Sequence, residues 1–230
     1  MRRRFLNAII IYNRSGFFRK VSFLKTFKSV KGRAQAEIII KKSRFIAHVF
    51  PADSEEEAKN YLMEVKEEYK DATHNVYAWQ VGVAKILQRC GDDGEPSGTA
   101  GRPILEVIKQ RGLTNVLIVV TRYFGGIKLG AGGLIRAYSQ AARAGLDKAE
   151  IAEKTLHDIY WVSADYSLWG QLSREIEKWG KIEEVTYTQR VEAKIFVLSS
   201  FSGDFEKNIV ELTAGNAVLK KIGSAYAPLK

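Results

Sequence analysis

The sequence is poor in cysteine and has no long apolar segment, and each shortage excludes a class of protein. Its 230 residues include a single cysteine, Cys90, so neither an internal disulfide nor a cysteine-based zinc site can form. No stretch reaches the roughly 20 apolar residues that a membrane-spanning helix requires. With 46% hydrophobic residues, the chain can still bury a substantial core. We therefore expect a globular, cytoplasmic protein with no membrane contact.

Acidic residues are absent from the first 30 positions, which contain eight lysines and arginines. This segment supplies +8 of the formal net charge of +10, so the remaining chain carries only +2. Overall basicity is therefore weak support for nucleic-acid binding. Three interpretations of residues 1–30 stay open: a disordered basic arm, an anchor for a membrane surface or nucleic acid, or a translation start placed too far upstream. We favour a disordered or mis-started extension, because nothing in it is periodic enough to pack.

Residues 115–142 combine an apolar run, a glycine-rich loop and an amphipathic helical segment. The uninterrupted apolar run 116–120 predicts a strand covered on both faces. A glycine loop that leads into a helix N-terminus can present backbone N–H groups to an anion. We predict a phosphate or nucleic-acid site here, although a tight turn that lets the helix pack closely is the alternative. The candidate residues are Arg122, Gly125, Gly126, Lys128, Gly130, Gly132, Gly133, Arg136 and Arg143.

A second candidate region is the loop Cys90–Pro103, which is rich in glycine, proline and acidic residues. Its carboxylates, among them Asp93 and Glu95, can bind magnesium, or one of them can act as a base. The alternative is a solvated turn. If this loop folds over the glycine loop, it forms a second half of one site, with Arg102 paired to a carboxylate. His74 is a further candidate base or stacking group, but a lone histidine at a strand entrance is more often structural.

Hydrophobic periodicity divides the rest of the chain into two domains, residues 31–150 and 156–225, joined by an expected linker at 151–155. The first domain mixes strands and helices. The second has the order strand, helix, strand, strand, helix, strand, which is the ferredoxin-like βαββαβ arrangement. Its tryptophans Trp161, Trp169 and Trp179 are expected in the core. We therefore predict an α+β protein.

Four segments together resemble the signature of the YigZ/IMPACT family. They are KKSRFIAHV (Lys41–Val49), HNVYAW (His74–Trp79), DGEPSGTAGRP (Asp93–Pro103) and TRYFGGIKLGAGGLIRAY (Thr121–Tyr138). The resemblance covers residues 31–150, and the remainder resembles the C-terminal domain of bacterial members; residues 1–24 fall outside it. It implies an N-terminal domain like the second domain of small-subunit ribosomal protein five and a C-terminal domain similar to a ferredoxin-like domain of elongation factor G.

The resemblance also bears on function. It implies that eukaryotic relatives act in translational control through protein partners, whereas it supplies no settled reaction for bacterial members. We expect a regulatory protein associated with translation that needs no cofactor and binds RNA, the ribosome or a translation-related protein. One alternative is an enzyme that binds a nucleotide or phosphometabolite and uses the acidic DGEP loop (93–96) with magnesium. Another is a protein-interaction module whose partner binds to the C-terminal sheet. We favour the binding protein, because no catalytic residue can be assigned; the oligomeric state is not indicated.

Overall fold

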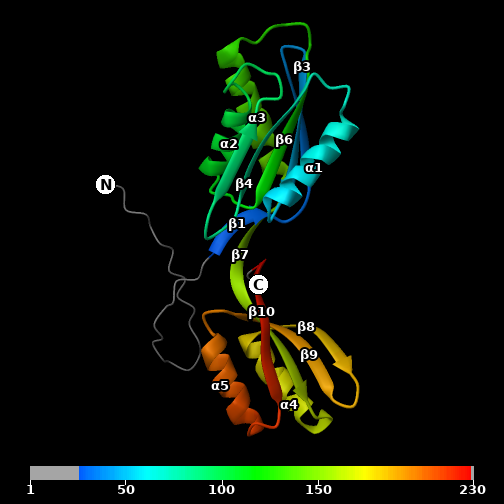
Figure 1. Ribbon diagram of the computed structural model, residues 1–230, viewed down its shortest axis with the longest axis vertical. Helices are drawn as coiled ribbons and strands as arrows, with labels where there is room; N and C mark the ends of the chain where they lie inside the picture. Colours follow the sequence, from blue (N-terminus) through cyan, green and yellow to red (C-terminus); the bar gives the residue numbers. More distant parts are fainter. Residues whose placement is uncertain (1–25, 229–230) are drawn as a thin grey trace, which may run out of the picture. The chain divides into compact units, whose positions relative to one another are not determined.

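The computed structural model describes residues 26–228, which form ten strands and five helices. They divide into two compact units, Phe27–Glu153 and the residues that follow from Lys154. Each unit combines a sheet with helices, as Figure 1 shows, so the predicted α+β class is confirmed. Within residues 26–228, no helix is both long and apolar enough to cross a membrane. The likeness of the first domain to a ribosomal protein stays a prediction.

The first unit is built on an antiparallel sheet with the strand order β2-β3-β6-β4-β5. Its first two strands form a hairpin whose turn lies at Lys41 and Lys42, both with positive φ. Such turns match the right-handed twist of the strands they join. The strands are β2 (Ala34–Ile40), β3 (Ser43–Pro51), β4 (His74–Val81), β5 (Leu87–Gly91) and β6 (Val116–Tyr123).

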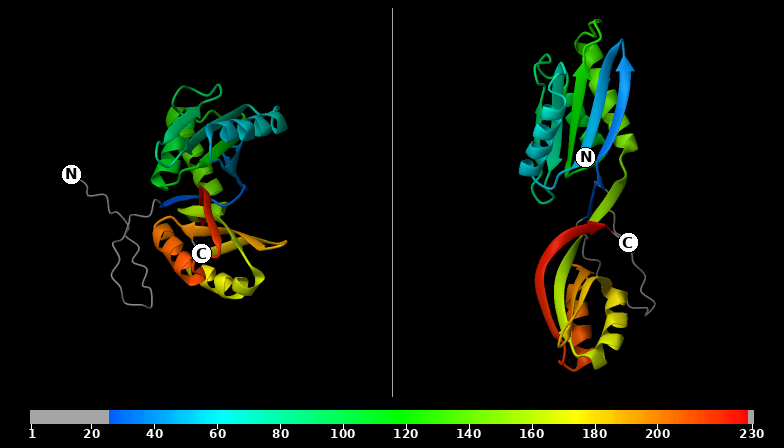
Figure 2. Two further views of the ribbon diagram at one scale, coloured as in Figure 1. Left: turned by 60° about the horizontal axis from the view of Figure 1, so that its bottom comes forward. Right: turned by 90° about the vertical axis from the view of Figure 1, so that its right-hand side faces the viewer.

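The central strand β6 is covered on both faces, as its uninterrupted apolar run predicts. Leu117 and Val119 pack with α1 (Glu55–Glu68) on one face. The alternate residues of the strand pack with α2 (Gly101–Gln110) and α3 (Ala131–Lys148) on the other face. Figure 2 shows the sheet lying between α1 and α3. Burying each such side chain stabilises the fold by about 1.5–3 kcal/mol, so the alternation locks the strand into its position.

Helix α1 begins with side-chain hydrogen bonds from Ser54 and Glu57 to the backbone around its start. The Ser54 hydroxyl accepts a hydrogen bond from the Glu57 N–H at 3.1 Å, and the Glu57 carboxylate accepts one from the Asp53 N–H at 2.8 Å. The Ser54 contact satisfies one of the N–H groups that a helix start otherwise leaves unpaired. The three-residue spacing of Ser54 and Glu57 is typical of such helix starts.

Residues 26–30 differ from the predicted extension, because they form strand β1 (Thr26–Val30). Val30 is fully buried in the core of the first unit, and the Ser29 hydroxyl donates a 2.9 Å hydrogen bond to the carbonyl of Asn115. The segment thus has packing partners that its basic surroundings in the sequence do not reveal. The prediction for residues 1–25 lies outside the described residues.

The predicted linker is part of a strand instead, and the predicted long loop is shorter than expected. Residues 151–155 belong to strand β7 (Ile151–Ala164), in which Ala152 and Thr155 are buried. The boundary between the two units therefore falls within a strand. In the acidic loop, Cys90 and Gly91 pair with β4 as the end of β5.

The second unit has the predicted βαββαβ order. Its strands pair in the order β10-β7-β9-β8, all antiparallel. Both helices pack on one face of this sheet (Figure 2). The elements after β7 are α4 (Tyr166–Trp179), β8 (Gly180–Tyr187), β9 (Val191–Leu198), α5 (Ser202–Thr213) and β10 (Val218–Pro228).

The three tryptophans of the second unit do not share one environment. Trp169 and Trp179 pack against the core as expected, but Trp161 does not belong to it. Side chains alternate between the faces of a strand. Because Tyr160 and Val162 take the core face of β7, Trp161 must project from the opposite face. The prediction of a core position for Trp161 was wrong.

A buried carboxylate, Asp158, lies at one end of the core face of β7. It is 4% exposed and accepts hydrogen bonds of 2.6–2.7 Å from Ser199, Ser202, Ser224 and Lys221. Burial alone would raise the pKa of Asp158, but these hydrogen bonds outweigh burial and hold its pKa well below the ordinary carboxyl value. One negative charge on β7 thus binds four donors, which come from the residue after β9, from the start of α5 and from β10.

We predict that Asp158→Asn lowers the free energy of unfolding at pH 7 by about 2 kcal/mol, since a hydrogen bond to a charged group contributes about 1.5–3 kcal/mol. Because the pKa of Asp158 is depressed in the folded state, its contribution is complete above the unfolded pKa of about 3.9 and is lost as the pH falls below it. In urea unfolding, the difference between wild type and variant should shrink by about 1 kcal/mol from pH 7 to pH 3. Glu211→Gln, on the exposed side of α5, is the control. An unchanged difference at the two pH values would contradict this account.

Candidate functional site

The glycine-rich loop between β6 and α3 needs glycine at several positions for purely local reasons. Gly126 and Gly130 have φ angles of 82° and 71°, a region that other residues rarely adopt. At Gly125, a Cβ atom would lie 2.0 Å from the backbone carbonyl carbon of Lys42. Gly132 is different, because a Cβ there would meet nothing closer than Arg136 Nη1 at 3.7 Å. The tight-turn interpretation therefore explains some glycines of the loop but not Gly132.

The first turn of α3 is open to solvent. Gly130 is the N-cap and supplies no side-chain acceptor, and the first helical hydrogen bond is donated by Leu134 to the Gly130 carbonyl. Among the described residues, no acceptor pairs with the N–H groups of residues 131–133. Unpaired N–H groups and the positive end of the helix dipole form a common anion-binding arrangement. The geometry required for binding an anion is therefore present.

Exposed cations and apolar side chains surround this turn. Lys128 and Arg136 are exposed, and neither makes an ion pair within residues 26–228. Phe124, Ile127 and Ile135 are 47%, 41% and 42% exposed. The surface around the turn thus joins positive charge to exposed apolar groups, and we call these five residues together with residues 130–133 the α3 tip.

Arg122 was predicted to belong to this surface, and the structure corrects that prediction. Its side chain is 6% exposed, and its Nη1 lies 2.5 Å from Oε1 of Glu95, whose side chain is 3% exposed. The guanidinium also packs over the rings of Phe45 and Phe124, at 5.4 and 5.5 Å from their centroids. A buried, paired guanidinium cannot reach a phosphate outside the protein, so Arg122 has an internal role.

The Arg122–Glu95 pair is completed by a tyrosine and a serine. The Tyr138 hydroxyl of α3 donates to Oε1 of Glu95 at 2.7 Å. Burial and this hydrogen bond raise the pKa of Tyr138 above its ordinary value, so the hydroxyl remains a neutral donor. The Ser43 hydroxyl accepts from Arg122 Nη2 at 3.4 Å and from the Gly125 N–H at 3.2 Å. The pair therefore connects the acidic loop, β6, α3 and the start of the glycine loop.

Asp92 of the acidic loop caps a helix. Its carboxylate accepts hydrogen bonds from the N–H groups of Gly98, Ala100 and Gly101, at 2.8, 3.1 and 2.8 Å. Two of these N–H groups belong to the start of α2, whose N-cap residue makes no side-chain bond of its own. A carboxylate at this position satisfies unpaired donors and complements the helix dipole. Asp92 thus explains how the loop is held before α2.

Asp93 and His74 hold the same loop to β4. The Asp93 carboxylate contacts Lys66 Nζ at 2.5 Å and accepts from the Asn75 N–H at 2.7 Å. Burial opposes ionisation, but these contacts hold the pKa of Asp93 below its ordinary value. His74 Nδ1 lies 2.8 Å from the Asp93 carbonyl, and its Nε2 lies 3.9 Å from Glu95 Oε1. His74 therefore has the structural surroundings that its position at a strand entrance suggested.

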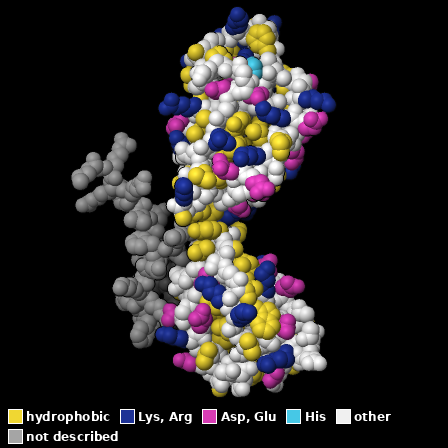
Figure 3. All heavy atoms as spheres, in the orientation of Figure 1, with side chains coloured by type: hydrophobic (Ala, Val, Ile, Leu, Met, Phe, Trp, Pro, Cys, Tyr) yellow, Lys and Arg dark blue, Asp and Glu magenta, His cyan; other side chains and the backbone are white. Residues whose placement is uncertain are grey.

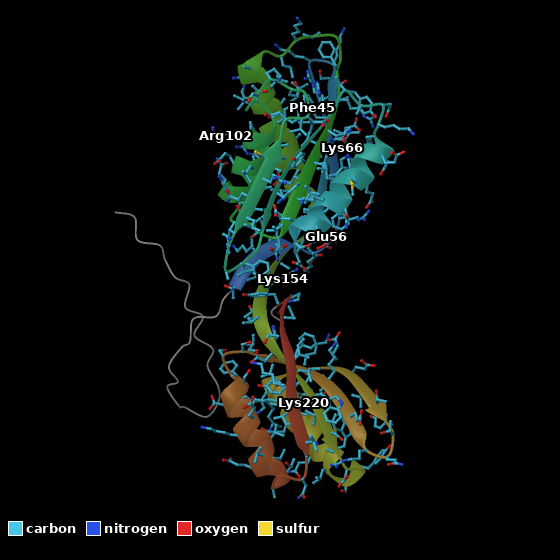
Figure 4. All side chains as sticks on the ribbon, viewed as in Figure 1. Phe45, Glu56, Lys66, Arg102, Lys154 and Lys220 are labelled. Atoms are coloured by element: carbon cyan, nitrogen blue, oxygen red, sulfur yellow. The ribbon has the colours of Figure 1, made fainter. Side chains whose placement is uncertain are left out.

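The remaining two predicted arginines line a different surface. Arg102 of α2 and Arg143 of α3 border a shallow groove of about 260 Å³ between these helices, together with Gln110 and Ser139. Figure 4 labels Arg102 on α2, on the opposite side of the sheet from Lys66 of α1. In the described part of the chain, Arg102 forms no ion pair, so its predicted partner among the loop carboxylates is not found.

The two predicted halves of the site therefore meet, but not as an open cleft. Glu95 and His74 approach the end of β6 through the buried Arg122, whereas Lys128 and Arg136 lie at the α3 tip. Sequence reasoning missed the partner role of Tyr138. A signal was available, because a tyrosine on the packing face of a helix needs a hydrogen-bond partner for its hydroxyl.

Two protein-family models match this chain, one in each of its two units. A family model described as the Impact N-terminal domain matches residues 41–146, and one described as a domain of unknown function (DUF1949) matches residues 162–216. The IMPACT family member YvyE of Bacillus subtilis is 42% identical over 86% of this chain and 92% of its own length. The IMPACT family member YigZ of Escherichia coli is 33% identical over 80% of this chain and 91% of its own.

A solved structure supports the fold over most of the chain. A crystal structure of a hypothetical protein, 30% identical in sequence, superposes with a TM-score of 0.61. The match covers 86% of this chain and 97% of the other. The likeness therefore includes both units.

We predict that Glu95→Ala lowers the free energy of unfolding by about 3–5 kcal/mol, because it leaves the buried Arg122 charge without a partner. Tyr138→Phe removes one hydrogen bond but leaves the ion pair, so its cost should be about 1 kcal/mol. Guanidinium unfolding measures both. Equal losses in the two variants would show that the ion pair is not what holds the acidic loop.

Proposed function

The chain belongs to the IMPACT family, and on this premise we propose that it is a translation-associated regulatory protein that binds RNA or the ribosome through the α3 tip. The family implies translational control in its eukaryotic members. The observation that carries the proposal is the bare first turn of α3, where three N–H groups have no acceptor among the described residues and Gly132 leaves the approach free of a side chain.

The chemistry of the α3 tip suits the phosphate backbone of RNA. N–H groups at a helix start and nearby lysine or arginine side chains are typical phosphate contacts. Lys128 and Arg136 are the cations that take this role, since Arg122 is buried and forms an ion pair with Glu95. Phosphate contacts carry no sequence information, so binding at this surface depends on shape and salt rather than on base sequence.

The proposal includes a cytoplasmic location, a translation-related protein as a further partner, and no cofactor. The magnesium-dependent enzyme is the weaker alternative, because each carboxylate of the acidic loop has its own protein partners. Asp92 caps α2, Asp93 contacts Lys66 and Glu95 contacts Arg122. Within residues 26–228, no three His, Cys, Asp or Glu side chains are grouped as metal ligands. No specific observation favours the enzyme.

We predict that the double variant Lys128→Ala/Arg136→Ala weakens binding to a fluorescein-labelled RNA hairpin about tenfold, through the loss of two charge-assisted contacts. The slope of log affinity against log salt should fall in magnitude by about 2, or about 1 for each lost phosphate contact. Fluorescence anisotropy at salt concentrations from about 50 to about 200 mM measures both quantities.

The matched control is Lys59→Ala, which removes an exposed lysine from α1 on the other face of the same sheet. Its affinity and salt slope should stay close to those of the wild type. Wild-type affinity and an unchanged slope in the double variant would overturn the role of the α3 tip, and co-sedimentation with purified ribosomes repeats the comparison on the larger target.

A further inference from the structure

The sheet of the second unit has one face that no described helix covers. Helices α4 and α5 pack on the core face, where Tyr160, Val162 and Ile195 are buried. Trp161, Ile159 and Phe196 alternate with these residues and do not belong to the core. They are half-buried rather than exposed, as is usual for side chains that stand beside one another on a sheet. We call this surface the open sheet face.

Strand register arranges the open sheet face in rows, because directly paired residues project from the same face. In one row Lys220 of β10, Trp161 of β7 and Lys194 of β9 are neighbours. In the next row Ile159 of β7 is opposite Phe196 of β9. The two aromatic side chains therefore lie diagonally on the two central strands, roughly 7–8 Å apart by the usual sheet spacing.

Two lysines and two carboxylates lie beside the rings on this face. Lys194 and Lys220 make no ion pair within the described chain, and Lys194 Nζ lies 5.7 Å from the centroid of the Phe196 ring. Basic, acidic and hydrophobic side chains are interspersed on the second unit in Figure 3, and Figure 4 labels Lys220 on β10. Two carboxylates, Glu184 and Glu192, lie on β8 and β9 to one side of Trp161. Because these carboxylates repel phosphates, the β10 side is the more favourable approach for a nucleic-acid strand.

From this arrangement we infer that the open sheet face binds single-stranded RNA, with Trp161 and Phe196 stacking on two unpaired bases. Aromatic side chains on the central strands of a four-stranded sheet present flat surfaces to bases, and lysines beside them contact the phosphates. The choice of RNA rests on the proposed role in translation. A protein partner fits less well, since the centre of a protein interface is depleted in charged residues, whereas here two lysines flank the central ring.

This surface differs from the α3 tip in what it requires of the RNA. Stacking needs bases that are not paired, whereas phosphate contacts are also available on a blunt-ended duplex, which has no unpaired bases. Substitutions at the open sheet face should therefore affect single strands alone. The proposals for the α3 tip and for the open sheet face can therefore be tested independently.

The test uses the full-length protein and a fluorescein-labelled, unstructured ten-nucleotide RNA in fluorescence anisotropy. Trp161→Ala should weaken binding about tenfold, while Trp161→Phe, which keeps an aromatic ring, should stay within about twofold of the wild type. Lys220→Ala should lower the salt slope by about 0.7, as expected for one phosphate contact on a single strand. Lys207→Ala, an exposed lysine of α5 on the helix side, is the charge-matched control and should change neither quantity.

Unchanged circular dichroism and thermal unfolding of Trp161→Ala would show that the variant is folded, which its position outside the core leads us to expect. Its binding to a blunt-ended RNA duplex should equal that of the wild type. The inference is overturned if the wild type does not bind the ten-nucleotide RNA, if Trp161→Ala binds it as well as the wild type, or if single-stranded DNA of the same sequence is preferred. The Lys128→Ala/Arg136→Ala result stands separately from all three outcomes.

Discussion

The buried ion pair between Arg122 and Glu95 is the constraint on which the first unit's functional end depends. Both side chains are almost fully removed from water, and a pair in such surroundings is stable only if its hydrogen bonds are satisfied. Tyr138 and Ser43 supply two of those bonds, whereas the buried Nε of Arg122 has no partner among the described residues. The Glu95 carboxylate thus positions the acidic loop, the end of strand β6 and helix α3 relative to one another. The bare first turn of α3 is presented to solvent by this internal arrangement.

Much of the fold could be predicted from the sequence, whereas the arrangement of the candidate site could not. The Arg122–Glu95 pair shows the reason. The two-sided burial of β6, the Ser54 cap of α1 and the βαββαβ order follow from patterns within short segments. The pairing of Arg122 with Glu95 joins residues 27 positions apart, and neither has a local signal that reveals its partner. An arginine beside a glycine loop therefore looked like a phosphate ligand although it is an internal contact.

The position of Trp161, in contrast, could have been predicted from the alternation of residues along β7. The general tendency of tryptophan to be buried led to the wrong prediction. Tryptophan is usually buried, yet the period-two alternation of Tyr160, Val162 and Ala164 already assigns the core face of β7 to other residues. Strict use of the alternation places Trp161 on the uncovered face. Its neighbours Lys194 and Lys220 could not be identified in the same way, because strand register depends on pairing between distant segments.

Charge distribution connects the two proposed surfaces. Since residues 31–230 carry a net charge of only +2, their long-range attraction for nucleic acid is small. Many of their cations are moreover neutralised by neighbours, as Arg111 is by Asp147 and Lys66 by Asp93. The proposed contact with RNA in this part of the chain therefore rests on short-range geometry. Unpaired N–H groups at the α3 tip and flat rings beside lysines on the open sheet face each supply such geometry. In the two proposals these surfaces bind different features of RNA, its phosphates and its unpaired bases.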